Sequence, residues 1–177
     1  TWQGEVYALP YGANAHALVY NKSLFDASGV GYPTADWTWN DALTAARLLT
    51  KDIAGRGTPD IWGLNLAGSV MSDMLLSFGG PVLDEDGRTV RVNNPVNAAA
   101  LGFFSELMSK GLDAYPRPAP NALQQFLSGR VAMAGLGVFT VPNLRSTAEF
   151  SWDAELFPVF EVAGRRYRNA FTSAEGW

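Results

Sequence analysis

The chain alternates between short apolar runs and segments in which apolar residues recur every three or four positions. Residues 13–20 form an almost continuous apolar run, which is typical of a strand buried on both faces, and a second run covers 61–66. Between 39 and 51 the apolar positions have helical spacing, and Thr38 with Asp41 has the pattern of a capping box. We therefore predict a strand, a helix over about 39–51 and a second strand.

The pattern continues to the C-terminal end. Asn94 as the cap and Pro95 at the first helical position predict a helix that ends before Gly111. Further elements are expected as helices over 22–28, 69–78, 121–128 and 140–146, the last broken near Pro142, and as strands over 6–9, stopped by Pro10, over 131–136 and over 154–160. Strands alternate with helices, which predicts an α/β domain with a mostly parallel or mixed central sheet flanked by helices.

Composition narrows the classes of function. A chain of 177 residues with 47% hydrophobic residues is the size of one domain. The net charge of −4 and the 17% of charged residues argue against nucleic acid or a membrane surface as a partner, and no apolar run has the roughly 18 residues of a spanning helix. Aromatic residues make up 12% of the chain and include six Trp, which favours a surface where flat rings meet sugars or partner proteins.

No arrangement of residues points to a metal, a cofactor or a catalytic centre. The chain has no Cys, so thiolate metal sites and thiol catalysis are excluded. His16 is the single His and lies between two Ala, so we interpret it as a hydrogen-bonded structural imidazole. The acidic segments 52–60 and 84–87 lack the alternating oxygen ligands of a calcium loop and are interpreted as turns.

A series of short motifs, in order, resembles family 1 of the extracellular solute-binding proteins. Each motif is weak alone, and the specificity lies in the ordered set, which spans essentially the whole chain: residues 4–10 (GEVYALP), 20–25 (YNKSLF), 38–41 (TWND), 60–63 (DIWG), 79–83 (GGPVL), 128–133 (SGRVAM) and 137–139 (GVF).

The resemblance implies a lobe of the type II periplasmic binding protein fold. Residues 1–12 are then expected to be a hinge strand, 13–162 the ligand-binding lobe, and 163–177 the return crossing toward a second lobe outside this chain. The implied function is not enzymatic: the protein binds a sugar or oligosaccharide between two lobes and delivers it to the transmembrane subunits of an ABC permease. The implied location is the periplasm or, as a lipoprotein, the cell surface, with the signal peptide outside these residues.

The resemblance also implies ligand contacts. Phe139 follows Gly137 at a position where the family usually has a stacking Trp, although Phe139 also fits as the first apolar residue of a helix packed on the sheet. Asn14 matches a polar sugar contact just after the hinge, and Tyr11 beside it fits either a stacking ring or interfacial core. The remaining candidates are Ser69, Ser72 and Asp73 at a strand-to-helix junction, where the family's aromatic residue is missing, and Glu175 and Trp177 after the return crossing.

Two other classes of function stay open at this stage. A glycoside hydrolase fragment would need two carboxylates roughly 5–10 Å apart that face one pocket. The clustered acids at 84–86 instead lie in a predicted turn. A separate carbohydrate-binding module would explain the aromatic residues but not the alternation of strands and helices.

Overall fold

The computed structural model describes residues 4–7, 9–66, 83–84, 86–109, 121–168 and 172–176. The helices are α1 (Lys22–Ser28), α2 (Trp39–Leu49), α4 (Pro95–Ser109), α5 (Ala122–Leu127), α6 (Val141–Thr147) and the 3-10 helix η1 (Val138–Thr140). The strands are β1 (Pro10–Asn21), β2 (Trp62–Leu66), β3 (Val131–Gly137), β4 (Trp152–Glu155), β5 (Phe160–Val162), β6 (Arg165–Tyr167) and β7 (Thr172–Gly176).

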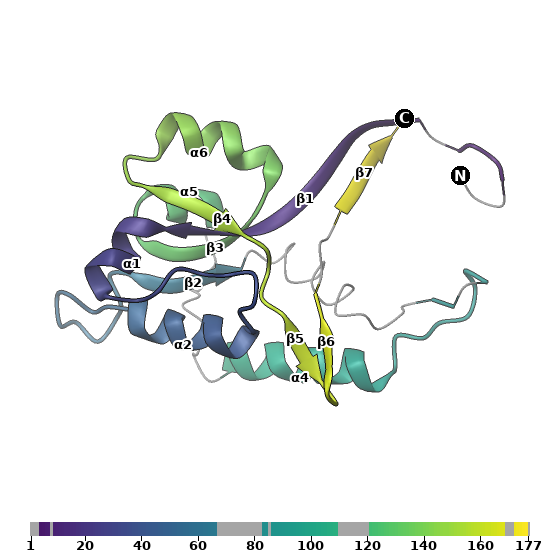
Figure 1. Cartoon of the computed structure of the whole chain (residues 1–177), viewed down its shortest axis with the longest axis horizontal. Helices are drawn as coiled ribbons and strands as arrows, with labels where there is room; N and C mark the ends of the chain where they lie inside the picture. Colours follow the sequence, from purple (N-terminus) through teal and green to yellow (C-terminus); the bar gives the residue numbers. More distant parts are fainter. Residues whose placement is uncertain are drawn as a thin grey trace.

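The central sheet is mixed and is organised around β1 (Figure 1). Its order is β2-β3-β1-β4, and β7 pairs with the first half of β1. The predicted α/β class with a mixed sheet is confirmed, but the expectation that parallel pairs dominate is wrong for the described strands, where only β2 and β3 run parallel. The alternation of strands and helices predicts parallel pairing only between strands that are consecutive in the chain. Strand β1 instead pairs antiparallel with β3, β4 and β7, which come much later in the chain.

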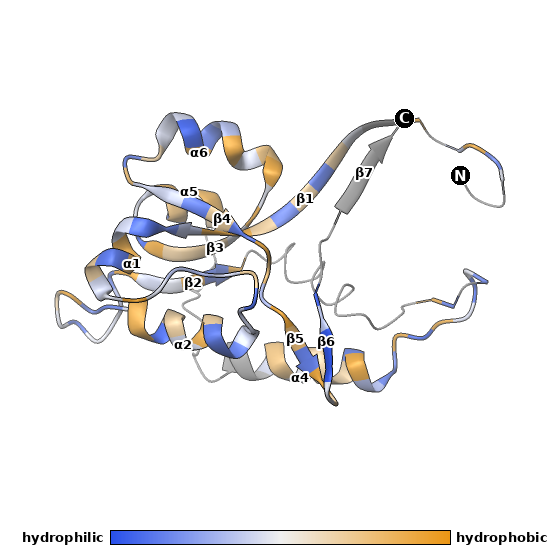
Figure 2. Ribbon diagram, viewed as in Figure 1, coloured by the Kyte–Doolittle hydropathy of each residue, from blue (hydrophilic) through white to orange (hydrophobic). Residues whose placement is uncertain are grey.

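Helices cover both faces of the sheet. On one face, α1 and α2 pack over Leu18, Tyr20 and Met133, and α4 joins the same apolar cluster through Phe104 beside Trp39. On the other face, α5 and α6 pack over Val19 and Leu136. Figure 2 shows orange apolar segments on β3 and on the helices that adjoin the sheet. The strand predicted at 13–20 is therefore buried on both faces only in its second half.

Proline residues account for three differences from the predicted elements. Pro10 begins β1 instead of stopping a strand, because proline at a strand's first residue removes no ladder hydrogen bond from its interior; Val6 and Tyr7 lie outside any strand. Pro142 lies in the first turn of α6, where no intrahelical partner for its N–H is needed, so the helix is not broken there. The strand predicted at 154–160 is divided, because Pro158 falls between β4 and β5.

The two long helices start where the sequence predicts. At α2, the backbone N–H of Thr38 donates to Asp41 Oδ2 (2.8 Å), and the N–H of Asp41 donates to Thr38 Oγ1 (3.3 Å), which confirms the capping box. At α4, Asn94 Oδ1 accepts from the N–H groups of Val96 and Asn97. The helix expected over 69–78 lies outside the described residues.

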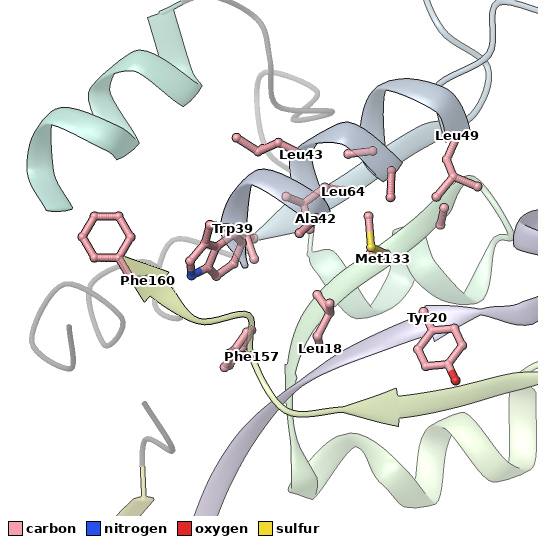
Figure 3. Packing of buried hydrophobic residues seen from close by; sticks show 14 of the residues in the cluster. Leu18, Tyr20, Trp39, Ala42, Leu43, Leu49, Leu64, Met133, Phe157 and Phe160 are labelled. Carbon is pink, nitrogen blue, oxygen red and sulfur yellow. The ribbon is translucent and has the colours of Figure 1, made fainter. Parts of the chain in front are cut away.

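Helix α2 packs directly on β2 because of a glycine. A Cβ atom built on Gly63 would overlap the carbonyl oxygen of Ala46 in α2, so no larger residue fits between the two backbones. Around this contact, Trp39 stacks on Phe157 with ring centroids 6.3 Å apart, and Figure 3 shows both rings beside Leu18 at the centre of the core. Gly63 thus sets the distance between the helix layer and the sheet.

We expect Gly63→Ala to lower the free energy of unfolding by roughly 1–3 kcal/mol, because the methyl group overlaps main-chain atoms that have to shift. Gly102→Ala is the matched control, since Gly102 lies on the exposed side of α4 with no atom within 4 Å of an added Cβ. That substitution should stabilise the helix by roughly 0.5–1 kcal/mol. Urea unfolding of the three proteins measures both effects, and equal effects of the two substitutions would contradict the packing at Gly63.

The capping box predicts a pH-dependent contribution to stability. Hydrogen bonds from the Thr38 hydroxyl and backbone N–H lower the pKa of Asp41 below its usual value. The carboxylate therefore stabilises the fold above the unfolded-state pKa of about 3.9, and this contribution is lost as the pH falls through the lower folded-state value. Asp41→Ala should cost roughly 0.5–1 kcal/mol at pH 7 and much less near pH 3 by urea unfolding. An unchanged difference at the two pH values would contradict this.

Candidate ligand-binding site

The candidate site begins where the core ends along β1. Leu18 and Tyr20 belong to the core cluster under α1 and α2, and His16 and Asn14 are the next two positions on the same face of the strand. Both side chains are only partly buried, and neither belongs to a core cluster. One face of β1 therefore changes from apolar to polar as the strand leaves the helix layer.

Strand β3 brings a third residue to the same place. Gly137, the last residue of β3, lies directly opposite His16 in the antiparallel pair. The ring of Phe139 lies over Gly137, since an added Cβ would overlap Phe139 Cε1 and lie only 2.7 Å from Cδ1 and 3.0 Å from His16 Nε2. Gly137 therefore leaves the space that the Phe139 ring and His16 occupy, and any larger residue at 137 would displace the ring.

Phe139 is not a core residue. Its relative exposure is 68%, and it belongs to neither apolar cluster. Of the two interpretations of the sequence, packing against the sheet as the first apolar residue of a helix does not fit this exposure. An exposed ring held over a glycine offers a flat apolar surface to a ligand.

Asn14 brings an unused acceptor to this surface. Its Oδ1 atom is buried and has no hydrogen-bond partner. A buried polar atom without a partner costs about 1–3 kcal/mol, so a ligand that donates a hydrogen bond to this oxygen would recover part of that cost. The structure thus places Phe139 and His16 at Gly137, and Asn14 two residues before His16 on the same face of β1.

His16 differs from the sequence interpretation. The sequence predicts a hydrogen-bonded structural imidazole; in the structure the residue is partly exposed, its Nδ1 atom is buried, and its Nε2 atom lies near Gly137, as the Phe139 ring does. The spacing of two residues from Asn14 is the signal in the sequence, because it places both side chains on one face of a strand. The pairing with Gly137 has no local sequence signal, since β1 and β3 are more than 100 residues apart.

Strand β7 lies beside the first half of β1. Strand β7 pairs antiparallel with β1, with Gly12 opposite Glu175 and Asn14 opposite Ser173. The backbone of Tyr11 lies in β1, beside the pair that Glu175 makes, but the structure does not describe the side chains of Tyr11 and Glu175. Ser69, Ser72, Asp73 and Trp177 lie outside the described residues. The described part of β2 ends at Leu66, beside Gly135 and two residues from the end of β3.

A cavity of about 340 Å³ lies elsewhere in the structure. It is bounded by the start of α2, by α4 and by β5, and its lining is Thr38, Trp39, Asn40, Ala99, Phe103, Val159, Phe160, Glu161 and Val162. None of the predicted ligand contacts lines it. The buried indole Nε1 of Trp39 has no hydrogen-bond partner, and Figure 3 shows this nitrogen on the side of the ring that faces Phe160.

The acidic segments are turns, as predicted. Asp52 accepts from the N–H groups of Arg56 (2.9 Å) and Gly57 (2.7 Å). Asp86 accepts from the N–H groups of Arg88 and Thr89, and these bonds, with Thr89 first, lower the pKa of its carboxyl. Among the described residues no group of three His, Cys, Asp or Glu could hold a metal ion, and no described helix is long and apolar enough to cross a membrane.

We expect Gly137→Ala to displace the Phe139 ring with little loss of stability. The added methyl group meets the edge of a side chain that can rotate, whereas at Gly63 it meets main-chain atoms. The free energy of unfolding should fall by about 1 kcal/mol or less, at the low end of overpacking effects. NMR of the Phe139 ring measures the displacement and urea unfolding the stability. Ring signals that match those of the parent protein would contradict the contact.

The sequence is similar to those of known binding proteins. The sequence profile of the bacterial extracellular solute-binding proteins matches residues 1–161. A putative binding protein of Brucella abortus (strain 2308) is 30% identical over 156 residues, which cover 82% of this chain and 36% of the relative. This chain therefore spans about a third of the length of that relative.

Solved structures show the same fold. An ABC substrate-binding protein of Listeria monocytogenes in complex with cycloalternan is 26% identical, with a TM-score of 0.81 over 99% of this chain and 44% of that one. A maltose/maltodextrin-binding domain of Bdellovibrio bacteriovorus bound to maltotriose has a TM-score of 0.80 at 19% identity, and covers 99% of this chain and 45% of its own.

Proposed function

This chain belongs to the bacterial extracellular solute-binding protein family, and we propose that it is part of the substrate-binding component of an ABC importer for a sugar or oligosaccharide. The observation that carries the proposal is the exposed ring of Phe139 over Gly137 at the end of β3, next to the strand β1, in which Asn14 holds an oxygen without a hydrogen-bond partner.

The chemistry of this surface fits a sugar. A sugar ring has an apolar C–H face that an aromatic ring can cover, and hydroxyl groups that lose affinity unless each finds a hydrogen-bond partner after water leaves. Phe139 offers the apolar surface, and Asn14 offers an acceptor for a hydroxyl. The two solved relatives above were obtained with cycloalternan and with maltotriose, which supports this class of ligand.

We further propose that the ligand lies between this lobe and a second one. Residues 1–12 and 163–177 would be the two crossings between lobes, which is supported by the pairing of β1 with β7 at Gly12 and Glu175. The length of the chain, less than half that of the solved relatives, also supports it. Ligand can drive closure only if it gains contacts in the closed form, so both lobes would contribute contacts before the protein docks on the permease.

The proposed location is the periplasm or the cell surface, because the family is extracellular and the permease is a membrane protein. The proposed role is binding without a catalytic step. Among the described carboxylates, Asp84 forms an ion pair with Arg91 at 2.8 Å, and Asp86 accepts a hydrogen bond from Thr89 within its own turn. These two acids therefore stabilise a turn, and their interactions do not support the pair of catalytic carboxylates that a glycoside hydrolase needs.

Isothermal titration tests the proposal with maltotriose and a panel of other sugars. The protein that includes the flanking sequence should bind at least one of them, and the 177-residue chain should bind the same sugar more weakly. Phe139→Ala should weaken binding about tenfold or more, because loss of a stacked ring costs about 1.4 kcal/mol or more. Ile53→Ala is the control, since Ile53 is 72% exposed in the loop before β2.

Three results would contradict parts of the proposal. A folded protein that binds no sugar in the panel would overturn the function. An affinity of the 177-residue chain equal to that of the longer protein would overturn the two-lobe account. An effect of Phe139→Ala no larger than that of Ile53→Ala would remove Phe139 from the site.

A further inference from the structure

We propose that His16 is a ligand contact that determines specificity: together with Asn14 it binds two hydroxyl groups of a neutral sugar whose apolar face lies on Phe139. This inference rests on the proposed function and adds to it a residue that the sequence pattern assigns to the interior. It also predicts that the site distinguishes sugars by the separation of two hydroxyl groups.

The imidazole of His16 lies near the Phe139 ring. Its Nε2 atom lies 3.0 Å from the point where a Cβ of Gly137 would be, and the Phe139 ring approaches the same point. The imidazole and the phenyl ring therefore meet over the glycine at the end of β3. A ligand that lies on Phe139 at this point has the imidazole within reach.

His16 is more exposed than the residues that follow it on the same face of β1. Leu18 and Tyr20, further along the same face of β1, are 0% and 6% exposed and belong to the core. His16 is partly exposed and belongs to neither core cluster. A residue needed only for packing would be apolar at this boundary, whereas His16 places the Nε2 atom of an imidazole near Gly137 and keeps Nδ1 buried.

The side chains of His16 and Asn14 can both form hydrogen bonds with hydroxyl groups. A neutral imidazole has one donor nitrogen and one acceptor nitrogen, so it can accept from or donate to a hydroxyl, which is itself both donor and acceptor. The free Oδ1 of Asn14 is an acceptor only. Since residues in a strand are about 3.3 Å apart, the two side chains leave β1 about 7 Å apart. They therefore suit two hydroxyl groups that are separated along the ligand and not a single one.

The experiment uses the fact that His16 is the only His among the 177 residues. In this chain, labelled at histidine, one imidazole signal reports on the site without further assignment, and NMR detects weak binding. Maltotriose is the probe. We expect the imidazole signal to shift to saturation, with the same midpoint as the signals of the Phe139 ring.

Two substitutions separate a ligand contact from a structural role. His16→Leu should weaken maltotriose binding about tenfold with an unchanged urea midpoint, and His16→Gln, which keeps a polar side chain of similar reach, should restore part of the affinity. Ile53→Ala serves again as the control and should bind as the parent chain does.

The outcomes distinguish this inference from the proposed function. If maltotriose moves the Phe139 signals while the imidazole signal stays in place, and His16→Leu binds as well as the parent chain, the role of His16 is overturned and the sugar site stands. If maltotriose moves neither group in a folded chain, both are overturned for this sugar class. A loss of affinity in His16→Leu that is matched by a lower urea midpoint would assign His16 to the structure and also overturn the inference.

Discussion

The hydrogen-bonded pairing of β1 is the interaction on which the rest of the structure depends. Its second half pairs with β3 and β4, and its first half pairs with β7. The strand is 12 residues long, and its side chains alternate between the two faces of the sheet along its whole length. One strand can therefore contribute residues both to the core and to the candidate site. The same face holds Leu18 in the core and Asn14 in the candidate site, so the position of the site is determined by the register of one strand.

Two glycines allow close contacts between the sheet and its neighbours. Gly63 allows the backbone of α2 to approach β2, which places the helix layer over the part of the sheet that contains Leu18. Gly137 allows the Phe139 ring and His16 to approach the end of β3. In each case a missing side chain determines where another group lies, but the neighbour is rigid main chain at Gly63 and a rotatable ring at Gly137. The first glycine therefore serves stability and the second the shape of the site.

The site itself is not arranged for stability. Phe139 exposes most of an apolar ring to water, and Asn14 holds a buried oxygen without a partner. Both features oppose folding, since apolar exposure and unpaired buried oxygens cost free energy. A ligand with an apolar face and a donor hydroxyl would relieve both at once. These two unfavourable features, one on β1 and one just after β3, distinguish the candidate site from the aromatic core around Trp39, where the rings pack on one another.

Local elements were determined by the sequence itself, because caps, periodicity and turn chemistry act over a few residues. Thr38 with Asp41, Asn94 with Pro95, and the acidic turns at Asp52 and Asp86 were predicted for this reason. The direction of strand pairing, the exposure of Phe139 and the place of His16 required the tertiary structure. They depend on contacts between residues more than 100 positions apart, such as His16 with Gly137, and no local pattern encodes which distant strand supplies the neighbour.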